Sequence, residues 1–173
     1  MDLSVVGFAQ TLPRRILASA TRFEAGEPLH SVATLSSGVA SANEFTLAAA
    51  DTPVVGTHRF GGIAIKGSLP AETGTLVAQT ALCACPIPNL GRIRGRAETV
   101  ASVDTDAEIL LLIGDVTLID YDATGASDGG QLYTIKETAS ADTSGLEIVE
   151  GNAAKQTLDV LVDVRAYRSD VTT

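Results

Sequence analysis

Three acidic side chains at alternate positions, Asp104, Asp106 and Glu108, are the strongest candidates for chemistry in this sequence. On an extended segment their carboxylates would share one face, where they could bind a hard cation such as Ca²⁺ or act in a hydrolase. The same residues suit the start of a short helix over 106–114, because acidic side chains stabilise the positive end of a helix. No glycine or second acidic run completes a calcium-binding loop, so the sequence favours the helix start.

Two thiols and two imidazoles are the remaining ligand types for a transition metal. A zinc site would need the distant His30 and His58 to converge on Cys83 and Cys85. We therefore interpret the cysteines as small apolar packing residues and the histidines as ordinary surface or half-buried side chains. The sequence motifs of zinc proteases, serine hydrolases and phosphate-binding loops do not occur. We expect no catalytic residue, no cofactor and no bound metal.

Arg92, Arg94 and Arg96 form the one basic stripe, with three guanidinium groups on one face of a strand. The stripe lacks interleaved aromatic side chains, and the chain has a net charge of −9, so nucleic acid is a poor partner. We expect the stripe to meet carboxylates of a neighbouring subunit, with an exposed, unpaired ridge as the alternative. Arg14 and Arg15 are further candidates for subunit contact.

These groups have to be positioned by β-structure. Short segments with alternating or β-branched residues are separated by clusters of Gly, Pro, Asn, Asp and Ser, which is typical of strands joined by turns. The expected strands are 30–35, 44–48, 58–65, 75–85, 92–98, 116–121, 131–137, 146–149 and 157–167. Helical spacing is confined to 106–114 and, less clearly, 11–23. The sequence predicts an all-β fold, a small sandwich or barrel with an extended N-terminal arm and at most one short helix.

The two ends of the chain differ most clearly in pattern. Between Leu158 and Ala166, apolar residues at even positions alternate with mostly charged residues at odd positions, which predicts a strand with one buried face. Residues 1–28 lack such alternation, and we interpret them as an arm that precedes a single β domain over 29–173. The arm either packs on its own domain or reaches a neighbouring subunit, and the sequence leaves both arrangements open.

Composition and charge exclude several classes of protein. The 173 residues are 45% hydrophobic and 19% charged, which fits one folded domain and not a disordered chain. No apolar run approaches the roughly 20 residues of a membrane-spanning helix, and the N-terminus lacks a secretion signal. Residues 1–100 carry eight basic and seven acidic side chains, whereas residues 101–173 carry four and fourteen. We therefore expect neither a nucleic acid nor a membrane partner.

A small, acidic β-protein rich in Gly, Ala, Thr and Val, with an arm and no evident active site, resembles the capsid decoration, or cement, proteins of tailed bacteriophages. Residues 23–29 are similar to the glycine-marked entry to the first strand in that family. Residues 52–57 followed by Gly61 and Gly62 are similar to its inner turn, and residues 160–168 to a terminal strand of phage virion proteins. The acidic C-terminal half and the Cys83 and Cys85 pair depart from the family.

The resemblance implies a non-enzymatic virion structural protein, made in the host cytoplasm, that stabilises a capsid by bridging neighbouring major capsid subunits. It also implies a homo-oligomer, above all a trimer, whose arm and arginine stripe contact neighbours. One alternative is a β-sandwich module that binds a carbohydrate or a host receptor, although the chain has no Trp and only three Tyr for stacking on sugars. The other alternative is the small hydrolase based on Asp104, Asp106 and Glu108.

Overall fold

The computed structural model describes residues 3–16, 23–31, 44–48, 53, 58–67, 79–121, 133–137 and 144–167. Within these ranges the chain forms one seven-stranded sheet, one two-stranded sheet and a single α-helix. The all-β fold expected from the sequence is therefore confirmed. No helix in these ranges has the length and apolar character needed to cross a membrane.

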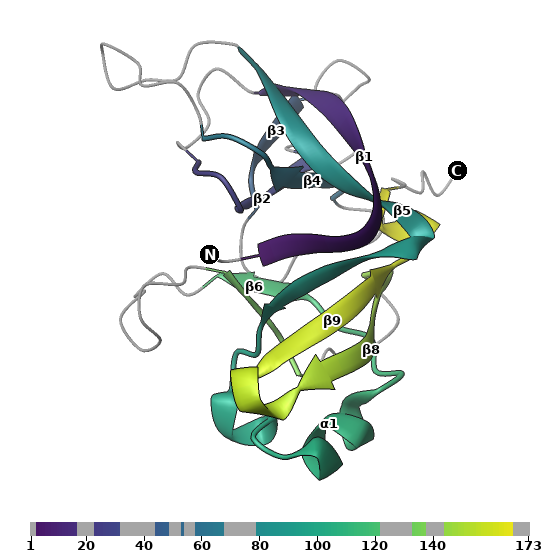
Figure 1. The fold of residues 1–173 in the computed structure, drawn as a ribbon. Helices are drawn as coiled ribbons and strands as arrows, with labels where there is room; N and C mark the ends of the chain where they lie inside the picture. Colours follow the sequence, from purple (N-terminus) through teal and green to yellow (C-terminus); the bar gives the residue numbers. More distant parts are fainter. Residues whose placement is uncertain are drawn as a thin grey trace.

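The first five strands close into a small barrel, in the upper part of Figure 1. They are β1 (Leu3–Ile16), β2 (Pro28–Ser31), β3 (Glu44–Leu47), β4 (Phe60–Ala64) and β5 (Gln79–Arg96). Their order in the sheet is β1-β3-β2-β4-β5, and a second pairing of β1 with β5 completes the ring. The expectation of a sandwich or barrel is thus met by a barrel in this part of the chain.

The second half of the sheet grows from the far end of β5. There β5 pairs with β9 (Thr157–Val162), which in turn pairs with β8 (Leu146–Asn152). The helix α1 (Asp106–Leu112) contacts β8 at the bottom of Figure 1, and β6 (Ile119–Tyr121) pairs with β7 (Tyr133–Ile135). Short 3₁₀ helices lie at 100–102, 153–155 and 164–167.

Two apolar clusters fill the interior, and the same two strands contribute to both. Leu3 of β1 and Ile93 of β5 belong to the cluster that packs against β8, β9 and α1. Ile16 of β1 and Cys83 of β5 belong to the cluster inside the barrel. All four side chains are almost fully buried, so β1 and β5 link the two cores.

The N-terminal arm packs on its own chain. Strand β1 pairs with β5 in an antiparallel register that runs from Leu3 opposite Gly95 to Ile16 opposite Gln79. Of the two arrangements left open by the sequence, residues 3–16 therefore adopt the first. The helix considered over 11–23 is wrong for residues 11–16, which belong to the strand, and residues 17–22 lie outside the described ranges.

One long strand replaces two expected ones. The expected strands 75–85 and 92–98 meet within β5, and the turn signal at 89–91 falls on a bulge instead of a turn. The register moves from Gly7 opposite Gly91 to Ala9 opposite Pro86, so β5 bulges out across from Phe8. A Cβ atom on Gly91 would lie 2.2 Å from the carbonyl oxygen of Phe8, which explains why glycine stands there. On both sides of the bulge, β1 and β5 are paired in regular register.

The C-terminal strand is confirmed over its first part, although Asp159, predicted on the exposed face, is buried beside Arg94. Leu158, Val160 and Val162 are buried as predicted, but the strand ends at Val162. The prediction of a strand to residue 167 is wrong, because the Asp163 carboxylate accepts a hydrogen bond from the Arg165 backbone N–H and turns the chain into a 3₁₀ helix. The side chain following this turn, Tyr167, is thereby directed toward the barrel.

Candidate functional site

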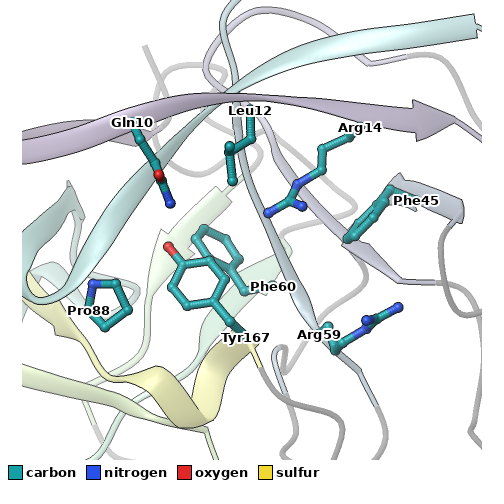
Figure 2. A pocket seen from close by; sticks show the side chains of 8 residues that line it. All are labelled: Gln10, Leu12, Arg14, Phe45, Arg59, Phe60, Pro88 and Tyr167. Carbon is teal, nitrogen blue, oxygen red and sulfur yellow. The ribbon is translucent and has the colours of Figure 1, made fainter.

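A cavity of about 280 Å³ lies against the barrel, where β1, β3 and β4 approach the C-terminal 3₁₀ helix (Figure 2). Eight side chains line it: Gln10, Leu12, Arg14, Phe45, Arg59, Phe60, Pro88 and Tyr167. Alternate residues of a strand share a face, and this places Gln10, Leu12 and Arg14 together on the cavity side of β1. Arg15, on the opposite face, has a side chain that is 68% exposed.

Arg14 is fixed at the wall of this cavity. Its Nε donates a hydrogen bond of 2.8 Å to the Gly61 carbonyl oxygen, and its Nη2 lies 3.5 Å from Cys85 Sγ. The guanidinium carbon lies 4.9 Å from the centre of the Phe45 ring, an arrangement that stabilises a cation. Figure 2 shows the guanidinium directed toward the space between Leu12, Phe60 and Phe45. Among the described residues, Arg14 has no carboxylate partner in a salt bridge or hydrogen bond.

Arg59 supplies the second positive charge. Its Nη2 is buried and lacks a hydrogen-bond partner within the described part of the chain. Burial lowers the pKa of the Arg59 guanidinium, and the nearby charge of Arg14 lowers it further. The two cations therefore repel each other at the cavity wall, and none of the described side chains that line the cavity is acidic.

The rest of the lining is largely apolar. The rings of Phe60 and Tyr167 lie 5.8 Å apart, tilted by 51°. The Tyr167 hydroxyl donates a hydrogen bond of 2.7 Å to the Pro86 carbonyl oxygen, and burial raises the pKa of this hydroxyl. Tyr167 therefore stays neutral. Gln10, which also lines the cavity, is exposed to solvent.

The two cysteines lie beneath this cavity as packing residues, as expected. Both are free thiols and almost fully buried in the barrel core. Burial raises the pKa of both thiols, to about 12 for Cys83. The Cys85 thiol donates a hydrogen bond of 3.3 Å to the Gly61 carbonyl oxygen, the same oxygen that Arg14 binds.

Two arginines of the basic stripe form ion pairs with carboxylates of the same chain. Arg92 lies 2.6 Å from Glu150, and Arg94 lies 2.6 Å from Asp159. Arg96 is half-buried. The complementarity expected for a neighbouring subunit is therefore met within the sheet, where β5 faces β9 and β8. Arg15 likewise forms an ion pair of 3.2 Å with Glu44.

The acidic trio begins a helix, as the sequence favoured. Thr105 is the N-cap of α1: its hydroxyl accepts a hydrogen bond from the Glu108 backbone N–H, and the Glu108 carboxylate accepts one from the Thr105 backbone N–H. Asp106 occupies the first turn. The three carboxylates therefore do not share one face of an extended segment. Within the described residues, no group of three or more His, Cys, Asp or Glu side chains could hold a metal ion.

The two histidines, distant in sequence, stack on each other. The ring centres of His30 and His58 lie 4.7 Å apart at an interplanar angle of 20°, and each Nδ1 is buried without a hydrogen-bond partner in the described ranges. Burial, together with the proximity of His58, lowers the pKa of His30 to about 4. His30 is buried instead of half-buried, whereas His58 is half-buried as expected. Their spacing in the sequence carries no signal of this contact.

A carboxylate pair joins the end of β5 to β6. Burial, a hydrogen bond with Asp120 and the charge of Asp120 together raise the pKa of Glu98 to about 7. Glu98 therefore stays protonated in acidic solution, where it donates a hydrogen bond to the Asp120 carboxylate. Neither residue was a candidate from sequence, because 21 positions separate them in the chain.

Most of the exposed large apolar side chains of the described residues lie in two patches, whereas Ile65, Leu82 and Val164 are exposed elsewhere. The helix patch consists of Leu110, Leu111 and Ile113, on α1 and directly after it. The bulge patch consists of Phe8 and Leu90, on the adjoining backbones of the β1–β5 bulge.

In comparisons with known proteins, no family model, no curated protein and no solved structure matches this chain.

Proposed function

We propose that this protein is a non-enzymatic structural protein of a phage virion that decorates the capsid and bridges neighbouring major capsid subunits as a homo-oligomer, with a trimer favoured. The resemblance drawn from residues 23–29, 52–62 and 160–168 suggests the particle and the partner. The observation that supports bridging is the presence of two separate apolar patches on one folded chain. A protein that joins two neighbours needs two contact surfaces.

The helix patch is suited to contact with another protein. Ile109 of α1 is buried near Gly151 of β8, whereas Leu110 and Leu111 are 69% and 80% exposed. Full burial of one such side chain contributes about 1.5–3 kcal/mol, so leaving neighbouring leucines in water is unfavourable for an isolated monomer. A partner surface placed over α1 would recover this free energy.

The bulge patch faces a different part of the surroundings. Phe8 is 64% exposed, and Leu90 lies across the bulge from it. In Figure 1 the bend where β1 and β5 run together lies at one side of the molecule, while α1 lies at its lower end. The two patches can therefore contact different neighbours at the same time.

Charge supports an outward-facing acidic half. Residues 101–173 carry fourteen acidic and four basic side chains, which would keep decorated particles apart in solution. Arg92 and Arg15 keep exposed positions at the edges of ion pairs, where they suit the polar rim of a contact. Arg14 is turned into the cavity, so we assign it no role in capsid contact.

The experiment compares capsids of the phage that encodes this chain, prepared without the protein, before and after its addition. The expected results are an oligomer in native mass spectrometry, co-sedimentation with the capsids and a higher temperature of capsid rupture. A double variant of each patch, Leu110→Gln with Leu111→Gln or Phe8→Ser with Leu90→Ser, should lower capsid binding at least tenfold.

The matched control is Leu82→Gln, which removes an exposed leucine outside both patches and should bind like the parent protein. A monomer that binds no capsid would overturn the proposal. Saturable binding of that monomer on a glycan array would favour the alternative, a carbohydrate-binding or receptor-binding module. Loss of binding by the Leu82 variant alone would place the contact elsewhere.

A further inference from the structure

We propose that the cavity lined by Arg14, Arg59 and Tyr167 binds a small organic carboxylate with an apolar body. This site is independent of capsid decoration, because it lies on the barrel and shares no residue with the two apolar patches. The argument rests on unbalanced charge, on available hydrogen-bond donors and on the chemistry of the remaining wall.

The positive charge at this cavity has no carboxylate partner among the described residues that line it. Arg15, Arg92, Arg94 and Arg165 each have a carboxylate oxygen within 3.2 Å. Arg14 and Arg59 line one cavity together, and no acidic side chain among the described residues lines it with them. In a chain of net charge −9, acidic side chains are abundant, yet this site is left positive. An anion bound between the guanidinium groups would relieve their mutual repulsion.

The donors are held in place before any ligand arrives. Arg14 is anchored by the Gly61 carbonyl oxygen and by the Phe45 ring, so its planar fork keeps one orientation. A guanidinium has five N–H donors, and the two contacts to Gly61 and Cys85 leave others available. Arg59 lines the same cavity, but its Nη2 is buried without a partner in the described part of the chain, so Arg59 contributes positive charge while Arg14 supplies the donors. Paired oxygens of a carboxylate match this geometry.

The remaining wall of the cavity favours an apolar body. Leu12, Phe60, Pro88 and the ring of Tyr167 cover most of it. A hydrated inorganic anion would leave these surfaces in water, whereas a carboxylate on an aromatic or aliphatic group would cover them. The volume of about 280 Å³ is close to the lower limit of the range of about 300–1,000 Å³ that is typical of small-molecule sites. Such sites also occur at the mouths of β-barrels.

The test titrates the full chain with benzoate and hexanoate, and with benzamide and inorganic phosphate for comparison, followed by calorimetry and by amide NMR shifts. Benzoate or hexanoate should bind saturably and at least tenfold more tightly than benzamide, which has the apolar body without the charge. Inorganic phosphate, which has the charge without the apolar body, should also bind at least tenfold more weakly. Shifts should centre on Leu12, Phe60 and Tyr167.

Variants locate the site. Arg59→Gln should weaken benzoate binding at least tenfold, and Arg14→Gln should do the same if the chain still folds without the bond to Gly61. Arg15→Gln, on the other face of β1, is the matched control and should bind benzoate like the parent. The helix-patch variant should also bind normally, which separates this proposal from capsid decoration. No saturable binding of either carboxylate, equal binding of benzamide, or unchanged binding by Arg59→Gln would overturn the proposal.

Discussion

The Arg94 guanidinium binds the Asp159 carboxylate through two parallel hydrogen bonds, with Nε 2.6 Å from Oδ1 and Nη2 2.7 Å from Oδ2. The two residues lie directly opposite each other on β5 and β9. The Asp159 side chain is 3% exposed, so its charge depends on this one arginine for compensation. The pair thus fastens the strand that links both cores to the acidic half of the chain.

Replacing Arg94 by Gln is expected to destabilise the fold by about 2–3 kcal/mol, because it leaves a buried carboxylate without its partner. The loss stays below that of a fully buried pair, since Arg94 itself is partly exposed. The control is Arg92→Gln, whose pair with Glu150 is exposed and should cost under about 1 kcal/mol. Urea unfolding measures both, and equal losses would contradict the prediction.

Thr105→Ala should lower the free energy of unfolding by about 1 kcal/mol, because the N-cap hydrogen bond to the Glu108 N–H is lost. Thr105→Ser keeps the hydroxyl and should be close to the parent. Thr99→Ala, at the exposed N-cap of a 3₁₀ helix whose side chain makes no capping hydrogen bond, serves as the control. Thermal unfolding followed by circular dichroism compares the three variants, and an unchanged melting temperature for Thr105→Ala would refute the capping role.

The contribution of His30 to stability should fall as the pH is lowered from about 6.5 to about 4, while the contribution of Glu98 changes in the opposite direction. The unfolded chain protonates His30 near pH 6.5, whereas the folded chain resists protonation until about pH 4. The contribution of the neutral ring is therefore present above pH 6.5 and is lost in that interval, by up to about 3 kcal/mol. In His30→Phe, which keeps a ring for stacking, the slope of stability against pH should flatten. If stability changed with pH equally steeply in His30→Phe and in the parent, His30 would be excluded as the source of the dependence.

Glu98 gives the opposite dependence. Its pKa is raised to about 7 in the fold, so the protonated form stabilises the protein below the unfolded value of about 4.5 and this contribution is lost as the pH rises to 7. Glu98→Gln, which mimics the protonated form, should melt at a higher temperature than the parent at pH 8 and at nearly the same temperature at pH 4.5. Glu150→Gln, at an exposed position, provides the comparison. A parent protein that is the more stable at pH 8 would rule out this assignment.

Both thiols should be inert in the native protein. Burial raises the pKa of Cys83 to about 12 and also raises that of Cys85, so neither forms a thiolate at pH 8. A disulfide-exchange reagent should label neither residue over hours in buffer and both within minutes in denaturant. Rapid labelling of either thiol in buffer would show that the barrel core opens.

Much of the strand content was predictable from alternation, and the exceptions have physical causes. Residues 58–65 and 146–149 each correspond to a strand, because buried and exposed positions alternate or the segment is apolar throughout. Strand β1 lacks this signal, since most of its residues between Val6 and Arg15 are exposed. Pro86 and Pro88 are residues that favour a turn, but the bulge in β5 accommodates them without ending the strand.

The cavity could not be predicted, because its walls come from positions between Gln10 and Tyr167 that only the closed barrel brings together. A partial signal exists in Leu12 and Arg14, which share a strand face with the buried Ile16. Recognising it would have required knowing that residues 3–16 are a strand. The partners of Arg92 and Arg94 were predictable in kind, as carboxylates, but their location in the same chain depended on the pairing of β5 with β9.

Strand β5 runs the length of the molecule and carries side chains of both apolar clusters, and β1 accompanies it over almost the whole distance. Separating the barrel from the α1 end would mean breaking these two backbones, so we expect neither part to survive excision and the chain to melt in one cooperative step. Tension applied at the helix patch would pass along covalent bonds and ladder hydrogen bonds to the bulge patch. The two patches are therefore mechanically coupled through β5.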